Sequence, residues 1–499
     1  MKKAWLVCLL AGSAMCGVAS ATDGPDVIVG DLPNISRYNT ATTEPLTALA
    51  VGTTSCNIGT ARLKWLQDPD NRHPTIGQNM FRYSTVDGAG RFEQIGLSFV
   101  KHGFFALSQS LCLTCNDPTD GTALGVGCSD PYSSSLNGSQ SGLGPRSQVN
   151  AATGFFPTDW NSAANLPAAQ WPISGALSRR LVVQKSDLFP ASNPGATYFV
   201  EGQYVAADDT ASLNSWNNNS FRQVNVAHVV SGSTDNFTFA ITSTTRRRMP
   251  AVEAWRQMDP AVTVVGSPFT TAGDMNSAPA NATDGYTKIP GDGYVALAYK
   301  VTDLGGGQWQ YEYAVQNMTS DRSIGSFSVP MGECAQATSI GFHDTFHHSG
   351  EPYSTTDWTD TKTTTELTWA TESFATNANA NAIRWGTLYN FRFVSNRAPI
   401  DGDVTLGLFK PGETPSITIA AKVPDVCTGT VCVADMDDGT GTGTPDGGVT
   451  IDDLLYYIGI FGGGMIQADV DDGNGTGTHD GGVTIDDLLY YIGRFNAGC

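Results

Sequence analysis

Basic residues are scarce in this chain. Lys and Arg together number 28 of 499 residues, against 48 Asp and Glu, which gives a net charge of −20. Such a surface repels a phosphate backbone, so we expect no nucleic-acid partner. Charged residues of either sign make up only 15% of the chain. This scarcity argues against coiled coils and long helical bundles, which are built from charged helix formers.

Long apolar runs are missing beyond the amino terminus. There, two Lys precede an apolar stretch from residue 4 to 18 and a small-residue site, which predicts a signal peptide, residues 1–21, cut after Ala21. A lipid anchor on Cys16 is the weaker alternative, because the usual Leu three residues earlier is absent. No later run approaches the roughly eighteen apolar residues of a spanning helix. We therefore expect no membrane span, and a secreted, extracellular or cell-surface protein.

Familiar catalytic signatures are also absent. The sequence has no Gly-x-Ser-x-Gly, His-Glu-x-x-His or Gly-x-x-x-x-Gly-Lys pattern, so the usual hydrolase, zinc-protease and phosphate-loop chemistries have no anchor. A glycosidase needs only two carboxylates that meet in space, which a sequence does not display. Glu93, Glu201, Glu253 and Glu312 are available, and each is expected to be structural.

Eight cysteines remain after the signal peptide, and an even number in an oxidising compartment predicts disulfides. They are Cys56, Cys112, Cys115, Cys128, Cys334, Cys427, Cys432 and Cys499. The spacing of Cys112 and Cys115 does not attach haem, because Asn116 stands where a His is needed. A zinc site formed by Cys112, Cys115 and Cys128 with His102 is the alternative to disulfides, which we favour.

The composition between residues 22 and 424 is that of a turn-rich, mainly β protein, with many Gly and 10% aromatic residues. Short segments of β-branched and aromatic residues, several of them alternating, predict an antiparallel β-sandwich over residues 180–424. These segments are 197–200, 237–241, 293–301, 309–315, 326–329, 367–369, 388–393, 404–408 and 417–420. Residues 54–157 have few alternating runs, so residues 22–179 are expected to form a loop-rich, cysteine-containing region.

His343, His347 and His348 form the densest histidine cluster. The first two would share one face of a helix, but the Gly, Ser and Thr around them disfavour a helix. On a strand this spacing covers about 13 Å, which is too far for one ion without other ligands. A polar loop is the favoured interpretation, and metal binding by these histidines stays open.

Residues 435–461 recur almost unchanged as residues 469–495, with a period of 34 residues. From residue 425 to 499 there are thirteen Asp, no Glu and a single basic residue, Arg494. Short carboxylates alternating with Gly suit a loop that wraps a hard cation such as Ca²⁺. The expected ligands are Asp435, Asp437, Asp446 and Asp453 in the first copy, and Asp469, Asp471, Asp480 and Asp487 in the second.

A short helix is expected to follow each loop. In the first copy it covers residues 453–458, with Leu454, Leu455 and Ile458 at helical spacing facing a core. The run Gly462-Gly-Gly464 then ends it.

On these residues the tail, 425–499, resembles a dockerin of the type that ends in Gly-Cys, here Gly498-Cys499. The resemblance implies two bound Ca²⁺ ions and attachment to a cohesin-like or cell-surface anchoring protein. Seven extra residues in each copy, 439–445 and 473–479, separate the third and fifth loop positions, so Asp438 and Asp472 are alternative ligands. A calcium-stabilised cap without a partner is the other interpretation of the tail.

Together these features predict a secreted or surface protein with a non-catalytic binding or structural β body and a calcium-dependent tail. A glycan is a possible ligand of the body. The alternative is an extracellular polysaccharide-degrading enzyme that carries a dockerin, which a carboxylate pair lined by aromatic residues would favour.

Overall fold

The computed structural model describes residues 24–38, 45–86, 88–161, 175–231, 234–269, 285–347, 351–426 and 432–498. The predicted signal peptide and His348 lie outside these ranges. The chain divides into two compact units, one formed by residues up to 331 and 336–424, the other by residues 332–335 and 425–499. The first unit contains only antiparallel strand pairs among its described residues, so the prediction of a mainly β, antiparallel body is confirmed.

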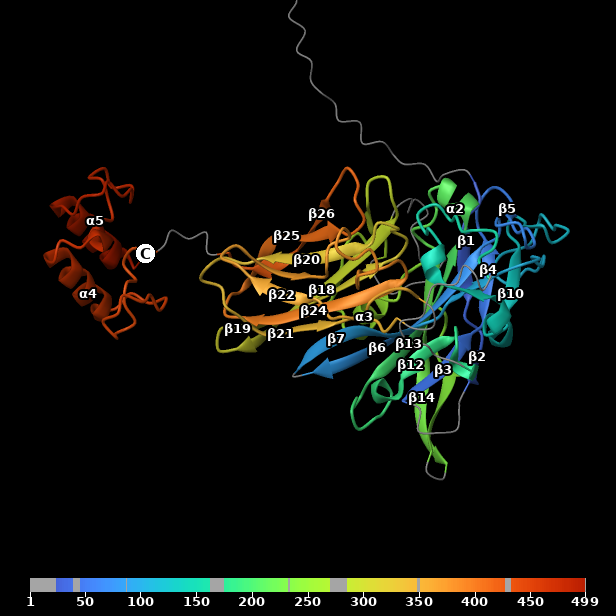
Figure 1. Ribbon diagram of the computed structural model, residues 1–499. Coiled ribbons are helices and arrows are strands. Elements are labelled where there is room, and N and C mark those ends of the chain that lie inside the picture. Colours follow the sequence, from blue (N-terminus) through green and yellow to red (C-terminus); the bar gives the residue numbers. More distant parts are fainter. Residues whose placement is uncertain are drawn as a thin grey trace, which may run out of the picture. The chain divides into compact units, whose positions relative to one another are not determined.

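The amino-terminal half of the body is built on one large sheet (Figure 1). Its strands run in the order β15 (Thr234–Ile241), β14 (Asn219–Ser231), β13 (Thr197–Val205), β6 (Thr75–Val86), β7 (Ala89–Leu97), β12 (Leu181–Gln184), β3 (Leu46–Val51) and β2 (Ile35–Tyr38). Strand β8 (Val100–His102) pairs with β6 and with β11 (Leu143–Gly144).

Smaller elements complete this half. A three-stranded sheet has the order β1 (Val27–Asp31), β4 (Thr53–Asn57) and β10 (Ser129–Tyr132), and β5 (Leu63–Lys64) pairs with β9 (Ala123–Leu124). The short helices are α1 (Ser134–Asn137), η1 (Gln140–Gly142), η2 (Arg146–Gln148), η3 (Gly175–Leu177), η4 (Lys185–Asp187), α2 (Ala207–Ala211) and α3 (Glu253–Met258).

The second half of the body is a β-sandwich. One sheet has the order β16 (Thr263–Val264), β18 (Tyr294–Gly305), β19 (Gln308–Asn317), β24 (Thr387–Ser395) and β21 (Ala337–His343), with β17 (Thr287–Lys288) paired to β18. The other has the order β22 (Thr359–Lys362), β23 (Glu366–Ala370), β20 (Ile324–Pro330), β25 (Pro399–Leu408) and β26 (Ser416–Pro424). Aromatic rings fill the space between them, for example Phe327 of β20 stacked on Phe391 of β24 at 4.5 Å.

Long strands run through the segment that we expected to be dominated by loops. Strands β6 and β7 pair with each other and join β12 and β13, so residues on both sides of position 180 share one sheet. The sandwich itself begins only at β16. The alternating pattern is absent from β6 and β7 because most of their residues are buried on both faces.

Strand β7 also connects the two halves of the body. The guanidinium of Arg91 on β7 contacts the carboxylate of Glu312 on β19 at 2.9 Å. The side-chain oxygen of Gln94 accepts a hydrogen bond from the backbone N–H of Leu388 on β24 at 2.7 Å. The two halves therefore form one continuous structure along β7.

The carboxyl-terminal unit is built from helices α4 (Ile451–Gly462) and α5 (Ile485–Ala497), with the short helix η5 (Ile466–Ala468) between them. The rings of Tyr457 and Tyr491 stack at 3.7 Å between centroids. The Tyr457 hydroxyl donates to the carbonyl of Ala468, and the Tyr491 hydroxyl donates to that of Ala434. Each copy of the repeat thus supplies a hydrogen bond to the start of the other.

Candidate functional site

Each repeat loop holds three buried aspartates on backbone N–H groups. In the first copy, Asp435 accepts hydrogen bonds from Asp446 and Gly447, and Asp437 accepts them from three glycines. Asp453 accepts from Met436, Asp437 and Thr450. Asp469, Asp471 and Asp487 make the equivalent bonds in the second copy. The loops therefore close around these carboxylates.

The glycines of the loop are needed for this arrangement. Gly439, Gly441 and Gly443 adopt φ values between +74° and +85° and turn their N–H groups toward the carboxylate of Asp437. A side chain at such φ values is strained, so only glycine serves here without cost. The seven extra residues in each copy thus form a cradle for the aspartate at the third position.

Burial and hydrogen bonding act in opposite directions on these carboxyls. Burial raises the pKa of Asp437 and of Asp453, but the backbone N–H donors outweigh it, and both pKa values lie below the usual range. Asp471 and Asp487 behave alike. These carboxyls consequently carry negative charge at neutral pH.

The acidic side chains of the loops suit a hard cation, but their described positions in the structure do not form a cation site. Among the described residues of the tail, none of the eight predicted aspartate ligands forms an ion pair, so the buried negative charge has no countercharge. The described residues also contain no group of three acidic, histidine or cysteine side chains placed to hold one ion. Asp446 and Asp480 are exposed, and their carboxylates bond to the N–H of Gly448 and Gly482.

The two helices present apolar side chains to solvent. Ile451, Leu455 and Ile458 on α4, and Ile485, Leu489 and Ile492 on α5, are between 39% and 63% exposed. We call each set of three an apolar stripe, since its members lie on one helix face at spacings of four and three residues. Leu455 and Ile458 were expected to face a core, and this expectation is wrong. Tyr457 and Ile460 are buried instead, because the stacked tyrosines occupy the interface between the copies.

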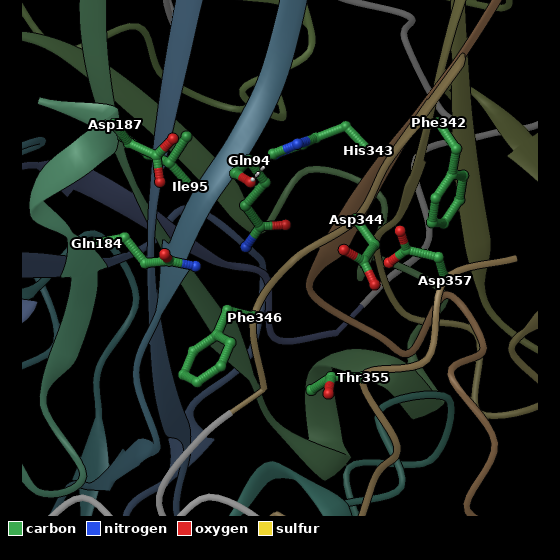
Figure 2. Close-up of a pocket in the computed structure, with 10 residues that line it drawn as sticks. All are labelled: Gln94, Ile95, Gln184, Asp187, Phe342, His343, Asp344, Phe346, Thr355 and Asp357. Atoms are coloured by element: carbon green, nitrogen blue, oxygen red, sulfur yellow. Dashed lines mark hydrogen bonds between the residues drawn. The ribbon is translucent and has the colours of Figure 1, made fainter. Parts of the chain in front are cut away.

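A cavity of about 360 Å³ lies in the body, beside β7 (Figure 2). Its residues come from three separate parts of the chain: β7, the end of β12 with η4, and the segment from the end of β21 to β22. The lining residues are Gln94, Ile95, Gln184, Asp187, Phe342, His343, Asp344, Phe346, Thr355 and Asp357. Burial raises the pKa of Asp344 to about 6, against the hydrogen bond from Asn381, and nearby Asp357 also raises it.

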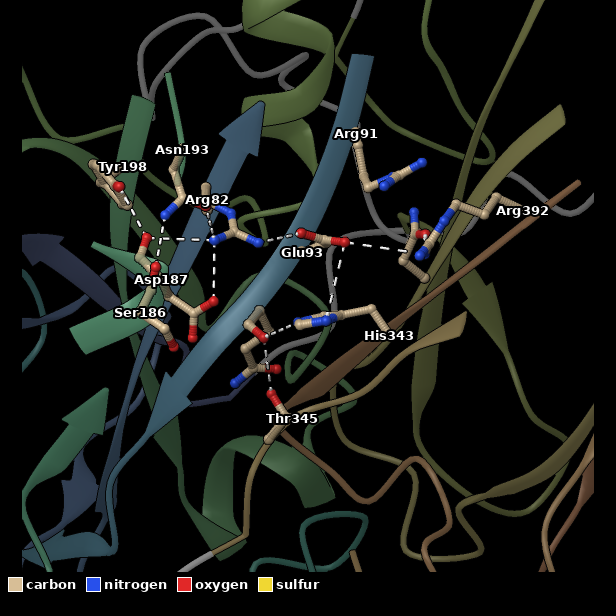
Figure 3. A network of polar contacts seen from close by, with 12 residues as sticks. Arg82, Arg91, Glu93, Ser186, Asp187, Asn193, Tyr198, His343, Thr345 and Arg392 are labelled. Carbon is tan, nitrogen blue, oxygen red and sulfur yellow. Dashed lines mark hydrogen bonds and ion pairs between the residues drawn. The ribbon is translucent and has the colours of Figure 1, made fainter. Parts of the chain in front are cut away.

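An ion-pair network supports one side of this cavity (Figure 3). Arg82 contacts Glu93 at 2.7 Å and Asp187 at 3.0 Å, while His343 and Arg392 each lie 4.0 Å from Glu93. Burial raises the pKa of Glu93, but His343 and Arg82 outweigh it and bring the pKa to about 2. Glu93 is therefore a permanent structural charge that fixes Arg82 and His343.

The other candidate glutamates are structural as well. Glu201 accepts hydrogen bonds from Asn79 and Gln316, and Glu312 pairs with Arg91. Glu253 pairs with Arg256 at 2.6 Å. None of the three lines the cavity.

The histidine cluster is divided in space. His343 ends β21, and its ring contacts the carbonyl of Gln94 at 3.1 Å. His347 is buried against Tyr389 and Tyr353 in an irregular segment. No metal group includes either of these described histidines.

The disulfide prediction is confirmed in the described region. Cys56 bonds to Cys112 and Cys115 bonds to Cys128, which rules out the zinc alternative in this oxidised form. Cys334 and Cys432 are disulfide-bonded too. Such bonds indicate an oxidising, extracellular compartment.

Sequence analysis did not single out the cavity residues Gln184, Asp187, Asp344 and Asp357. They come from distant segments that are brought together by the pairing of β12 with β7 and by the contact of the end of β21 with β7. The one local signal was the histidine cluster, since Asp344 follows His343 directly.

Comparison with known proteins leaves the chain without an assigned family. No family model matches it, and no curated protein matches it. Among solved structures, the N-terminal domain of the Streptococcus gordonii adhesin Sgo0707 is 10% identical, with 81% of this chain and 97% of that chain covered, and the TM-score is 0.19. The B domain of a biofilm-associated protein is 9% identical, with 88% and 96% covered, and the TM-score is 0.13. Scores this low do not establish a shared fold.

In the described part of the chain, no helix is long and apolar enough to cross a membrane.

Proposed function

We propose that the chain is an extracellular or surface protein that attaches to a protein partner through its carboxyl-terminal unit. The observation that carries this proposal is the pair of apolar stripes on α4 and α5. The stripes expose six large apolar side chains in a unit of about 75 residues, and Met465 and Ile466 between the helices are exposed as well. This exceeds what a solvated helix needs, and such patches mark docking sites. The stripes occupy equivalent positions in the two copies, so each copy can present the same contact.

Charge defines the partner further. The tail carries thirteen Asp against one Arg, and exposed Asp452 and Asp486 lie beside the stripes. A complementary partner has an apolar patch rimmed by basic residues. The resemblance of the repeat to dockerins makes a cohesin-like or cell-surface anchoring protein the favoured partner class.

Calcium binding by the two loops belongs to the same proposal. Six buried carboxylates without an ion-pair partner among the described residues support it, because they supply the negatively charged oxygen ligands that a hard cation prefers. Asp435, Asp437 and Asp453 would hold an ion in the first loop, with Asp469, Asp471 and Asp487 in the second, after a rearrangement of the loop that brings the three carboxylates together, since the described side chains are not placed to hold one ion. The bound ion would lower the free energy of the closed loop.

The body is proposed to be a non-catalytic binding domain, with a glycan as its ligand. The cavity also supports the alternative, a polysaccharide-degrading enzyme, because it brings Asp187, Asp344 and Asp357 together with Phe342 and Phe346. A glycosidase needs two carboxylates, and any two of these three aspartates would supply them. Release of reducing sugar by the full chain, lost in Asp344→Asn, would favour the enzyme.

Attachment is tested with the labelled full chain and intact cells of its own source that lack their own copy of the protein. We expect saturable binding that falls at least tenfold in the double variant Leu455→Glu/Leu489→Glu, and less in each single variant because one stripe remains. Thr364→Glu, which adds the same side chain at an exposed position of the body, is the matched control and should bind like the native chain.

Protease treatment of the cells should abolish binding if the partner is a protein. Undiminished binding of the double variant would contradict the proposal. So would a concentration-dependent dimer in sedimentation that the double variant loses, because the stripes would then serve self-association.

A further inference from the structure

The cavity beside β7 has the size and lining of a small-molecule site. Its volume of about 360 Å³ falls in the lower part of the range typical of ligand pockets and accommodates a single sugar ring. Hydrogen-bonding side chains make up most of its lining, together with the rings of Phe342 and Phe346. This mixture suits a ligand that has both polar edges and an apolar face.

The polar groups are distributed around the cavity. Figure 2 shows Gln184 and Asp187 on one side, with Phe346 below Gln184, and Asp344, Asp357 and Thr355 on the other side. If the ligand were instead a lysine side chain, its apolar stem and single polar end would leave the polar groups of one wall of the cavity without hydrogen-bond partners. A pyranose ring carries hydroxyl groups around its whole rim and can satisfy both walls.

The charge of the lining restricts the kind of sugar. Three carboxylates line the cavity, and no Lys or Arg is among its described lining residues. Arg82 lies behind Asp187 and is itself paired with Glu93. His343 also lines the cavity, but it lies 4.0 Å from Glu93 and contacts the carbonyl of Gln94. A carboxylate or sulfate on the ligand would therefore meet three carboxylates without a Lys or Arg partner.

We propose that this cavity binds one pyranose residue of a neutral or amino-bearing glycan. Asp344, Asp357 and Gln184 accept or donate hydrogen bonds at its rim, and Phe346 contacts its apolar face. The inference rests on the proposed role of the body as a glycan-binding domain and names the site and the sugar class.

The test is calorimetry on the full mature chain with three oligosaccharide probes: neutral hexose oligomers, chitosan oligomers and oligogalacturonides. We expect a neutral or an amino-bearing oligomer to bind at least tenfold more tightly than the acidic one. Asp344→Asn, Gln184→Ala and Phe346→Ala should each weaken that binding fivefold or more. Asp360→Asn and Phe155→Ala change exposed side chains outside the cavity and should leave it unchanged.

Gln184 is exposed at the end of β12, so Gln184→Ala should leave the fold intact. This variant keeps the test decisive if another variant misfolds. No binding of any probe, equal binding of the acidic oligomer, or unchanged affinity in Gln184→Ala and Phe346→Ala would overturn the inference. Tighter binding of a lysine amide than of any sugar would also overturn it. Hydrolysis of a bound oligomer would contradict the non-catalytic body while leaving saccharide binding intact.

Discussion

Asp130 is a buried carboxyl on β10 whose burial raises its pKa to about 7, against a backbone hydrogen bond. No ion pair reaches it from the described residues. Its neutral form is therefore favoured by folding, in contrast to Glu93, whose neighbours His343 and Arg82 keep it charged. The same body thus contains carboxyls that ionise far above and far below their usual pH.

The pKa of Asp130 predicts how stability depends on pH. A carboxyl with a raised folded-state pKa stabilises the fold below its unfolded pKa of 3.8 and loses that contribution as pH rises through about 7. The contribution of Asp130 to the free energy of unfolding should fall by up to about 1.4 kcal/mol per pH unit in that window. In calorimetry at pH 5, 6.5 and 8, Asp130→Asn should flatten the fall in Tm and exceed the native Tm at pH 8.

Exposed Asp360→Asn is the control and should follow the native profile. A native Tm that rises steadily from pH 5 to 8, or an Asp130→Asn profile parallel to the native one, would contradict the assignment.

At the start of each tail helix, one aspartate side chain accepts hydrogen bonds both from the residue that caps the helix and from the preceding loop. Asp487 accepts from Thr484 at the start of α5 and from Val470 and Asp471 in the loop. Thr484 is the N-cap in a capping box with Asp487. One carboxylate therefore connects the loop to the first turn of the helix.

We predict that Asp487→Ala loosens α5 in the full chain even in chelator, by about 2 kcal/mol for the lost cap and loop bonds. Hydrogen exchange of the α5 amides measures this loss. Asp486→Ala removes the same charge from an exposed neighbour and should exchange like the native chain. With calcium present, calorimetry should find about one ion fewer in Asp487→Ala only.

Equal exchange in the two variants would show that Asp487 does not hold the loop. An unchanged ion count in Asp487→Ala would remove it from the proposed calcium ligands.

At the scale of the whole molecule, all described strands precede residue 425, while the carboxyl-terminal unit includes residues 332–335. We predict that a chain ending at Pro424 folds, provided that disulfide-bonded Cys334 is replaced by Ser. The large amino-terminal sheet and the β-sandwich each retain their own core in this shorter chain. Its thermal transition should therefore stay within a few degrees of that of the body in the full chain. Calorimetry and circular dichroism measure this, with Cys334→Ser in the full chain as the control. An aggregate that forms only on truncation would contradict the prediction.

The sequence was most informative where one face of an element is exposed. Strands β25 and β26 alternate in burial over residues 403–407 and 418–423, and both were predicted as strands. Strands β6 and β7 were missed because they are buried on both faces, which removes the alternation. In the repeat, the helices were predicted, but Leu455 was placed in the core because apolar character alone does not distinguish a buried helix face from an exposed one.

The cavity, in contrast, could not be predicted from the sequence. Asp187 and Asp344 are 157 positions apart in the sequence, and they approach because β12 pairs with β7 while His343, at the end of β21, contacts Gln94 of β7. No local spacing encodes such a meeting.

The exchanged hydrogen bonds of Tyr457 and Tyr491 have a consequence for how this tail is inherited. Each tyrosine hydroxyl finds its acceptor at the residue just before the other copy, so a lone repeat would leave a phenol, a carbonyl and one face of a ring without partners. Recombination that carried a single copy to another gene would deliver a segment unable to fold. Gene fusions should therefore gain or lose this tail in whole pairs of repeats.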